Sequence, residues 1–306
     1  SDPFNHPNSS SSSFVLVGVP SLESFHTSLG ILFCSGYVIT LVGNGLVLLV
    51  IRLDNSLRDP VHCFLGMLAV IDVVMVTSIV PKMLSVFWMK SMEIGYTACF
   101  VQMFLVHSTT SEESGVLLAM ALDRYVAICH PLRYQAILNR QTIARIGLAI
   151  VVRALLTMVP FTGMVTNLPY CRSHVVAHSY CEHMAVAKLA CADPRPSGRY
   201  SMAVSSLIVG VDVAFIAVSY GMILQTILGK KSCWKAFSTC GCHICVMLLY
   251  YIPGIVSIYV QYFSSGVSTQ AQVLLADFYL TFPTMMNPIV YSMRTKQIRQ
   301  GVLKML

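Results

Sequence analysis

The sequence predicts an all-α fold, a bundle of seven membrane-spanning helices with the N-terminus outside and a short membrane-surface helix at the C-terminus. The first observation is composition: 56% of the 306 residues are hydrophobic and only 11% are charged, whereas a soluble domain has about 25% charged residues. The second is a series of seven apolar segments, each long enough to cross a bilayer. The third is an uneven distribution of Lys and Arg between the ends of those segments.

The seven segments differ in the charges that they contain. The first has none, and the sixth has only a possible charge at His243. The other five contain ionisable residues, which are costly within a bilayer and therefore usually functional. In chain order the segments are 29–51; 63–88, with Asp72 and Lys82; 99–129, with Glu112, Glu113, Asp123 and Arg124; 143–168, with Arg145 and Arg153; 200–228, with Asp212; 236–263; and 273–293, with Asp277.

Most of the positive charge falls on one side of these segments. Cytoplasmic loops carry the excess of Lys and Arg in membrane proteins, so the richer side is predicted to be cytoplasmic. The net charge of +7 therefore reflects membrane orientation and does not indicate a nucleic-acid module. The richer side carries Arg52, Arg58, Arg124, Arg133, Arg140, Arg145, Lys230, Lys231, Lys235, Arg294, Lys296, Arg299 and Lys304; the poorer side carries Lys82, Lys90, Arg172, Lys188, Arg195 and Arg199.

This orientation divides the chain into three parts. They are an extracellular N-terminal segment 1–28, a seven-helix domain 29–293 and a cytoplasmic amphipathic tail 294–306. Asn8 begins the tripeptide Asn8-Ser9-Ser10, a glycosylation sequon that is meaningful only on an extracellular segment. The serine run 9–13 has no side chain able to pack, so we expect it to be disordered.

Four of the 11 cysteines lie at the outer ends of the predicted spans. They are Cys99, at the start of the third span, and Cys171, Cys181 and Cys191, in the loop after the fourth. Disulfides persist outside the cell, and four cysteines can pair in three ways. The remaining cysteines lie within spans or on the cytoplasmic side, where we expect reduced thiols that pack as small apolar side chains.

The third span carries a polar stripe. Its polar residues recur three or four residues apart, which is about one helical turn, so they share a helix face. They are His107, Thr110, Ser111 and Ser114. A polar stripe on an apolar helix needs partners inside the bundle. Ligand binding and interhelical hydrogen bonding both supply such partners, and both remain open at this stage.

A set of motifs spread over almost the whole chain resembles the odorant receptors, a branch of the rhodopsin-like G-protein-coupled receptors. The main motif is MALDRYVAICHPL at 120–132, at the inner end of the third span. The loop 181–191 and the tail 294–299 are similar to the class I, fish-like subgroup. The accompanying motifs are GNG at 43–45, LAVID at 68–72, SY at 219–220, KAFSTCGCH at 235–243 and PTMMNPIVY at 283–291.

The resemblance implies a receptor that binds a small odorant in a pocket on the extracellular side and activates a stimulatory G protein, which raises cAMP. The expected pocket lies between the third, fifth, sixth and seventh spans, under the loop that follows the fourth. The ligand-binding residues expected there are His107, Thr110, Ser111, Met184, Val204, Ser205, Ile208, Tyr251, Gly254, Ile255, Ile258, Tyr262 and Asp277.

The resemblance also implies residues for coupling, covalent structure and ion binding. On the family's pattern the disulfides are expected to be Cys99–Cys181 and Cys171–Cys191. Asp72 and Glu113 are expected to face one another and to hold a sodium ion; the alternative is a neutral acid hydrogen-bonded to its neighbour. The residues expected to mediate activation and G-protein coupling are Asp123, Arg124, Tyr125, Tyr220, His243, Asn287, Pro288 and Tyr291.

One departure from the family bears on the ligand. Class I receptors for fatty acids have a His-Arg-Phe stretch near the outer end of the sixth span, where this chain has Gln261, Tyr262 and Phe263. Without that arginine a buried carboxylate has no bidentate partner, so we expect a neutral and mainly apolar ligand.

Two other classes of membrane protein are weighed against a receptor. A transporter or channel for a small solute is the main alternative, but we find neither inverted repeats nor a continuous charged path. A membrane enzyme would need a constellation such as His-Glu-x-x-His or Gly-x-Ser-x-Gly, and neither string occurs. We therefore expect no catalytic activity and no cofactor beyond the possible sodium ion.

Overall fold

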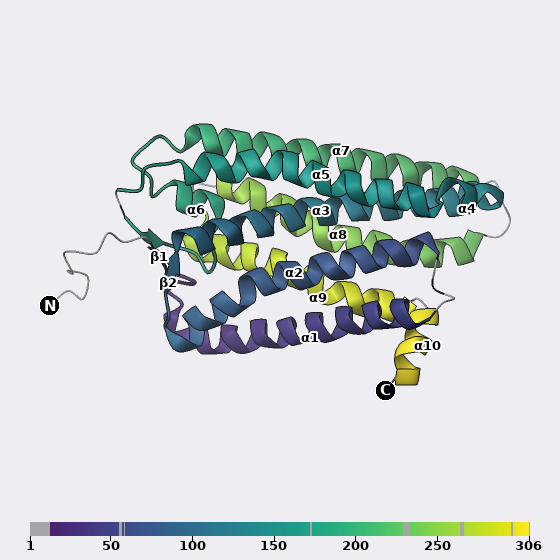
Figure 1. Cartoon of the computed structure of the whole chain (residues 1–306), viewed down its shortest axis with the longest axis horizontal. Coiled ribbons are helices and arrows are strands. Elements are labelled where there is room, and N and C mark those ends of the chain that lie inside the picture. Colours follow the sequence, from purple (N-terminus) through teal and green to yellow (C-terminus); the bar gives the residue numbers. More distant parts are fainter. Residues whose placement is uncertain are drawn as a thin grey trace.

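Long helices that run along one axis dominate the fold (Figure 1). The computed structural model describes residues 13–54, 57, 59–171, 173–228, 233–263, 266–294 and 296–305; for 233–239, 242, 261–263, 292–294, 296–297 and 304–305 it describes the backbone alone. Asn8 and the side chain of Tyr262 lie outside the described residues. The long helices are α1 (His26–Leu53), α2 (Pro60–Met89), α3 (Tyr96–Cys129), α5 (Arg140–Thr166), α7 (Arg195–Leu228), α8 (Cys233–Phe263) and α9 (Thr269–Arg294).

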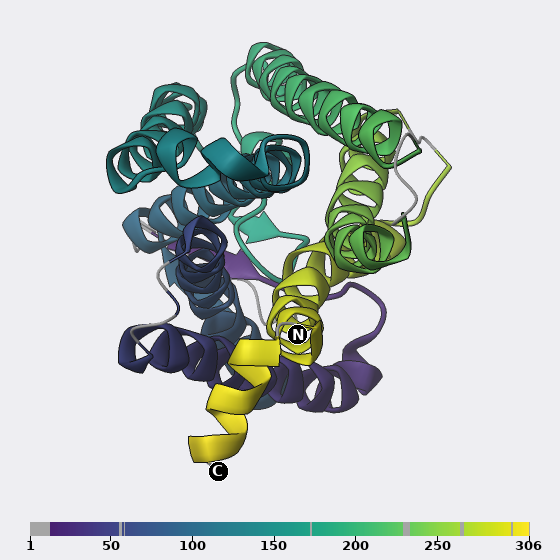
Figure 2. The ribbon, with the colours of Figure 1, turned by 90° about the vertical axis from the view of Figure 1, so that its right-hand side faces the viewer.

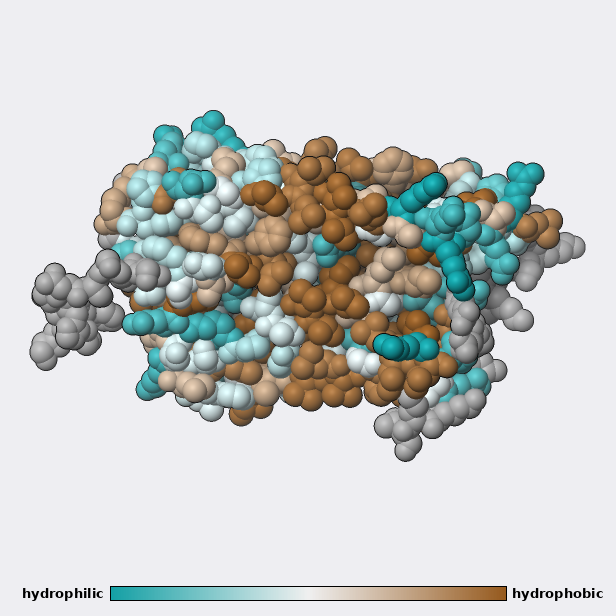
Figure 3. Space-filling model, viewed as in Figure 1, coloured by the Kyte–Doolittle hydropathy of each residue, from teal (hydrophilic) through white to brown (hydrophobic). Residues whose placement is uncertain are grey.

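These helices have the length and composition of membrane spans. Six of them, α1, α2, α5, α7, α8 and α9, each contain a window apolar enough to cross a bilayer, and α3 makes a seventh when it is counted with Pro131–Ile137, which follows after a bend of 113°. Apolar side chains gather over the middle of the face shown in Figure 3, and hydrophilic ones towards its two ends. The all-α architecture of seven spans that the sequence predicts is thereby confirmed.

Most of the helices extend beyond the predicted apolar segments. For example, α1 begins at His26, α7 at Arg195 and α9 at Thr269, three to five residues before the segments expected from hydropathy. The reason is that backbone hydrogen bonding continues the helix past the hydrocarbon, where polar side chains are tolerated. The prolines within α8 and α9, among them Pro253 and Pro288, do not end those helices.

A small sheet closes one end of the bundle, which we call the disulfide end. Its strand order is β2-β1-β3 (Glu93–Gly95, Ser13–Leu16 and Val175–Val176). β1 pairs antiparallel with β2 and parallel with β3. Ser13 is therefore ordered, contrary to the disorder expected for the serine run, because the side chains that follow it, Phe14 and Leu16, are fully buried; residues 9–12 lie outside the described part of the chain.

The opposite end, which we call the Arg124 end, carries the short helices η2 (Pro131–Arg133), α4 (Tyr134–Ile137) and α10 (Lys296–Met305). Two other short helices, η1 (Glu23–Phe25) and α6 (His183–Ala187), lie at the disulfide end. Seen from the Arg124 end, α10 lies across the bundle and projects from it (Figure 2). It is anchored on α1, because Ile298 is fully buried and a side chain at Gly301 would come within 2.5 Å of Val50.

Candidate functional site

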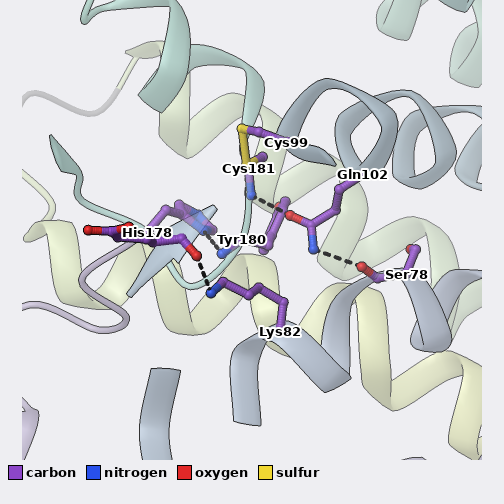
Figure 4. Close-up of a disulfide and its surroundings, with 8 residues drawn as sticks. Ser78, Lys82, Cys99, Gln102, His178, Tyr180 and Cys181 are labelled. Atoms are coloured by element: carbon purple, nitrogen blue, oxygen red, sulfur yellow. Dashed lines mark hydrogen bonds between the residues drawn. A yellow bond between two sulfur atoms is a disulfide. The ribbon is translucent and has the colours of Figure 1, made fainter. Parts of the chain in front are cut away.

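The loop 167–194 between α5 and α7, which we call the lid, is fastened to the helices beneath it (Figure 4). The Cys99–Cys181 disulfide joins the start of α3 to the lid, which confirms the predicted pair. The Cys181 amide donates to Gln102 Oε1 at 2.9 Å, and Gln102 Nε2 donates to the Ser78 carbonyl at 2.7 Å. The lid is therefore tied through α3 to α2.

Two further links complete the attachment of the lid. A second disulfide joins Cys171 to Cys191, with their Cα atoms 5.8 Å apart, and closes the lid on itself. Ser179 Oγ donates a short hydrogen bond to Asp277 Oδ1 on α9. Because these links join the lid to α3 and α9 and close it on itself, the lid is held as a fixed cover over the disulfide end.

Losing the lid disulfide should destabilise the protein. Cys99→Ser removes a bridge of a kind that typically contributes about 2–5 kcal/mol, so we expect strongly reduced surface expression, whereas Cys34→Ser, at a free cysteine, should have little effect. Peptide mapping under non-reducing conditions should recover the Cys99–Cys181 and Cys171–Cys191 crosslinks. A Cys99–Cys171 or Cys99–Cys191 crosslink would refute the pairing.

Two histidines and a glutamate of the lid are buried between it and the helices. Burial lowers the pKa of His178 to about 3 and that of His183 to about 3, the nearby His107 ring adding to the second shift. Burial raises the pKa of Glu182 above its usual range. Because their pKa values are lowered, both histidines are neutral near neutral pH. His183 Nε2 lies 2.8 Å from Ser197 Oγ on α7.

Acidification should therefore loosen the lid. The folded-state pKa of each histidine is below its unfolded value of about 6.5, so the stability that each contributes is complete above about pH 6.5 and is lost as the pH falls towards 3. Near pH 5 the loss is about 2 kcal/mol per histidine. The thermal unfolding midpoint should decrease as the pH is lowered from neutral to about pH 5.

The raised pKa of Glu182 changes stability in the opposite direction as the pH falls. The contribution of His183 is therefore measured by comparing the unmodified protein with a variant. His183→Gln keeps a neutral polar side chain beside Ser197 and cannot take up a proton, so its midpoint should depend less on pH than that of the unmodified protein. Equal pH dependence in the two proteins would contradict this assignment.

A cavity of about 100 Å³ lies beneath the lid. It is bounded by α3, α5, α7, α8, α9 and the lid residues Tyr180 and Glu182. The polar stripe predicted on α3 lines it in full, and so do three further residues predicted to bind the ligand, Ser205, Ile208 and Ile258. The complete lining is Val106, His107, Thr110, Ser111, Ser114, Met158, Tyr180, Glu182, Ser201, Ser205, Ile208, Val209, Tyr250, Ser257, Ile258, Tyr279 and Leu280.

Two polar groups on this lining lack a partner. His107 Nε2 and Ser111 Oγ are buried and make no hydrogen bond to the residues that the structure describes. A buried polar group without a partner costs free energy, whereas Thr110 satisfies its hydroxyl on the Val106 carbonyl at 2.8 Å. His107 and Ser111 are thus available to a ligand in the cavity.

Other residues predicted to bind the ligand lie elsewhere. Gly254 packs against Tyr279, whose ring would be 2.8 Å from an added Cβ, and Ile255 is exposed on the outside of α8. Val204 packs into the apolar core at the disulfide end. Met184 lines a separate hollow of about 260 Å³ nearer the end of the bundle, and Asp277 is held by Ser179.

Directly next to the cavity, an ion pair between the partly buried Arg153 and the buried Asp212 joins α5 to α7. Arg153 Nη1 donates to both carboxylate oxygens of Asp212, at 2.7 and 2.9 Å, and its Nη2 donates to the Ser111 carbonyl at 2.7 Å. Gly115 makes room for the guanidinium, because a Cβ there would be 2.9 Å from Arg153 Nη2. The sequence places both charges within spans but their pairing was not foreseen.

Ser114 extends this ion pair to α8. Its Oγ donates to Asp212 Oδ2 at 2.6 Å and lies 2.8 Å from Tyr251 Oη. Since the single Ser114 hydroxyl proton is used on Asp212, Tyr251 must donate to Ser114. Tyr251 is absent from the cavity lining and instead connects α8 to the charged pair. A change at Ser114 can therefore reach α8 through one hydrogen bond.

A pair of buried carboxylates lies deeper in the bundle. Asn287 Nδ2 donates to both oxygens of Asp72 at 3.1 Å and lies 3.4 Å from Glu113 Oε1. Neither carboxylate forms an ion pair with a Lys or Arg in the described part of the chain. α2, α3 and α9 thus converge on two buried carboxyl groups that share Asn287.

The Arg124 end contains a local ion pair. Arg124 binds the buried Asp123 carboxylate through Nε, at 2.9 Å, and through Nη2. The second oxygen of Asp123 accepts from Tyr134 Oη on α4 at 2.7 Å, a partner that sequence reasoning missed. This pairing holds Arg124 on its own helix.

The other residues predicted for coupling lie on α3, α7, α8 and α9. The Tyr220 hydroxyl is buried and lacks a hydrogen bond to any described residue. The rings of His243 and Tyr291 are 5.6 Å apart between α8 and α9, and Tyr125 Oη is 3.3 Å from His130 Nε2. Pro288 packs against α1, where it would be 2.9 Å from a Cβ at Gly43.

Comparison with known proteins agrees with this arrangement. The sequence profile of the olfactory receptor family matches residues 33–306. The chain is 49% identical to Olfactory receptor 52I2 of Homo sapiens over 98% of its own length and 87% of that protein, and 48% identical to Olfactory receptor 52I1 of Homo sapiens over 98% and 94%. Olfactory receptor 52K1 of Homo sapiens is 45% identical over 95% and 94%.

A match over nearly the whole length includes every element that bounds the cavity, the ion-pair network and the Arg124 end. The chain therefore belongs to the olfactory receptor family, in the class I subgroup that contains family 52, and is a rhodopsin-like G-protein-coupled receptor, not an enzyme.

Proposed function

We propose that this receptor binds a small, neutral and mainly apolar odorant in the cavity beneath the lid, and that the bound odorant activates a stimulatory G protein to raise cAMP. The observation that carries the proposal is the pair of unpartnered buried groups, His107 Nε2 and Ser111 Oγ, in a covered cavity that borders α8. A ligand hydroxyl or carbonyl would satisfy one of them, and apolar side chains would contact the remainder of the ligand.

The proposed orientation places the disulfide end outside the cell and the Arg124 end in the cytoplasm of a plasma-membrane receptor. Its support is the excess of Lys and Arg near the Arg124 end, together with disulfides at the other end, where an oxidising compartment would preserve them. The segment 1–28 would be extracellular, with Asn8 glycosylated, and the tail 294–306 cytoplasmic.

The charge of the cavity lining supports a neutral ligand. No Lys or Arg is found among the residues that line the cavity, and Glu182 contributes an acidic group at its upper rim. An ionised acid would lose hydration beside Glu182 without gaining a cation, which is costly in a buried site. The volume of about 100 Å³ supports a small ligand, since a cavity of about 150 Å³ accommodates benzene.

Coupling would run from Ser114 to the Arg124 end. A ligand that contacts Ser111 and Ser114 would alter the hydrogen bond from Tyr251 and so shift α8 relative to α3. Movement of α8 would carry His243 away from Tyr291, release Arg124 towards Tyr220 and Tyr291, and open a slot for a G-protein helix.

The buried acids would hold a sodium ion. Asp72 and Glu113 supply carboxylate oxygens, which suit a hard cation, and Asn287 fixes their positions. Two buried carboxylates without a basic partner need either a cation or a proton, so the donor set fits sodium, which would supply the missing positive charge and link α2 to α3.

The proposal is tested with a series of short-chain alcohols and the carboxylic acids of the same length, in a cAMP assay on transfected cells. The alcohol should be the stronger agonist, and its potency should rise along the series by about 0.8 kcal/mol per methylene until the cavity is full, at about four heavy atoms. Ser111→Ala should weaken the alcohol about two- to tenfold through loss of one hydrogen bond.

Tyr262→Arg supplies the cation that the chain lacks at this position. It should gain a response to the acid while losing potency for the alcohol. If the acid is the stronger agonist on the unmodified receptor, the proposed preference for neutral ligands is wrong.

A further inference from the structure

A groove on the outside of the bundle lies apart from the odorant cavity. Its volume of about 620 Å³ falls within the range of small-molecule sites, about 300–1,000 Å³. Val70, Leu148 and Val151 on its walls are 50%, 64% and 43% exposed, so the groove opens to the surrounding lipid. The lining, from α1, α2, α3 and α5, is Leu48, Gly66, Met67, Val70, Ile71, Glu112, Val116, Ala144, Gly147, Leu148, Ile150 and Val151.

Glu112 is the one ionisable residue in this lining. It lies at the middle of α3 (Tyr96–Cys129), half-buried, where the surrounding solvent is hydrocarbon. It forms no ion pair or hydrogen bond with any residue in the described part of the chain, in contrast to Glu113, whose carboxylate lies beside Asn287. An acid at this depth is expensive unless a partner compensates it.

The odorant cavity cannot supply that partner. Successive residues of a helix point about 100° apart, and on α3 the neighbours Thr110, Ser111 and Ser114 line the cavity, whereas Glu112 and Val116 line the groove. The partly buried Arg153 is committed to Asp212 and to the Ser111 carbonyl. Any partner for Glu112 must therefore enter the groove from the lipid.

We propose that this groove is a second binding site, for a lipophilic amine that enters from the bilayer and pairs its nitrogen with the Glu112 carboxyl. The pair forms between a neutral amine and a protonated acid, and the proton passes from the carboxyl oxygen to the nitrogen, so the site gains no net charge. The alkyl chain lies against Met67, Leu148 and Val151. Gly66, Ala144 and Gly147 provide the space, since a Cβ at Gly147 would meet Met67 at 3.0 Å.

The amine is favoured over an alcohol by charge complementarity. An alcohol can form one hydrogen bond with the carboxyl, whereas an amine adds the attraction of opposite charges, which is strong in a medium of low dielectric constant. A charge-assisted hydrogen bond in such a site exceeds a neutral one by about 1.4 kcal/mol, which corresponds to about tenfold in affinity.

The test is photolabelling of the full-length receptor in nanodiscs of phosphatidylcholine, whose zero net charge removes general attraction of the amine to the membrane. Two probes are compared, a medium-chain alkylamine with a diazirine group and the alcohol with the same chain and diazirine. The peptides that contain 66–71 and 144–151 should be labelled by the amine at about tenfold lower concentration than by the alcohol. Equal labelling by the two probes would overturn the proposal.

Three variants locate the site. Glu112→Gln keeps the size and hydrogen bonding of the side chain, and should reduce amine labelling to the level of the alcohol; unchanged amine labelling would refute the pairing. Ala144→Phe fills the groove and should abolish labelling by both probes. Leu156→Phe, on the lipid-exposed face of the same helix, should leave labelling unchanged, and a comparable loss there would show that the groove is not the site.

Discussion

Asp212→Ala is expected to remove most of the folded receptor from the cell surface. Asp212 is 1% exposed and binds Arg153 through both carboxylate oxygens. Removing one member of a buried ion pair leaves the other charge without compensation and costs about 3–5 kcal/mol. Surface expression, detected by an antibody to an N-terminal tag, and the thermal unfolding midpoint of the purified receptor would both measure the loss.

An exposed ion pair of the same receptor provides the control. Asp193 binds Arg195 at 2.9 Å, but both side chains are exposed, and solvent screens pairs of this kind so that they contribute little to stability. Asp193→Ala should therefore be expressed normally. If Asp212→Ala behaves like Asp193→Ala, the buried pair does not stabilise the bundle as proposed.

A double variant separates stability from signalling. Arg153→Met combined with Asp212→Leu replaces the ion pair by apolar side chains, which is often neutral or stabilising, so expression should recover relative to Asp212→Ala. Signalling should not recover, because Ser114 loses the carboxylate that orients it towards Tyr251. Recovery of both would mean that this network has no part in coupling.

Helical periodicity explains what the sequence predicted correctly about the site. The stripe from His107 to Ser114 reaches the cavity because spacing alone assigns these side chains to one face of α3. The seven spans follow from hydropathy in the same way, since the requirement for apolar length is set by the bilayer. The family assignment then decides between the receptor and the transporter or channel alternative in favour of the receptor.

Some residues assigned to the ligand lie outside the cavity lining because of tertiary contacts that periodicity does not encode. Asp277 is held by Ser179, which is 98 residues away along the chain, and the lid conformation that brings them together leaves no pattern in the sequence. Gly254 and Ile255 are on α8 as expected, but the rotation of that helix directs one at Tyr279 and the other outwards.

Some missed features did leave a signal. Arg153 and Asp212 are opposite charges in two different spans, and since isolated charges are not tolerated there, their pairing could have been inferred. The continuous apolar run from Phe14 to Val17 is likewise consistent with a buried strand, although its partner strands, β2 and β3, are too short to be recognised.

Arg124→Ala is expected to abolish G-protein activation while leaving the cavity beneath the lid intact. Arg124 is bound to Asp123 at the end of the bundle opposite to the lid, so its removal changes no residue of the cavity lining. Without the guanidinium, nothing is left to engage Tyr220 and Tyr291 when α8 moves. The cAMP response to an active odorant should fall to background in cells selected for equal surface expression, whereas Arg133→Ala, at an exposed arginine nearby, should signal normally.

Tyr134→Phe should have the opposite effect on the same switch. It removes the hydrogen bond from Tyr134 to Asp123 but keeps Arg124, so the closed arrangement loses about 0.5–1.5 kcal/mol and the active population rises about two- to tenfold. Basal cAMP should increase without odorant, and the double variant with Arg124→Ala should be silent. Normal signalling by Arg124→Ala, or a silent Tyr134→Phe at equal expression, would show that the Asp123–Arg124–Tyr134 contacts do not hold the receptor closed.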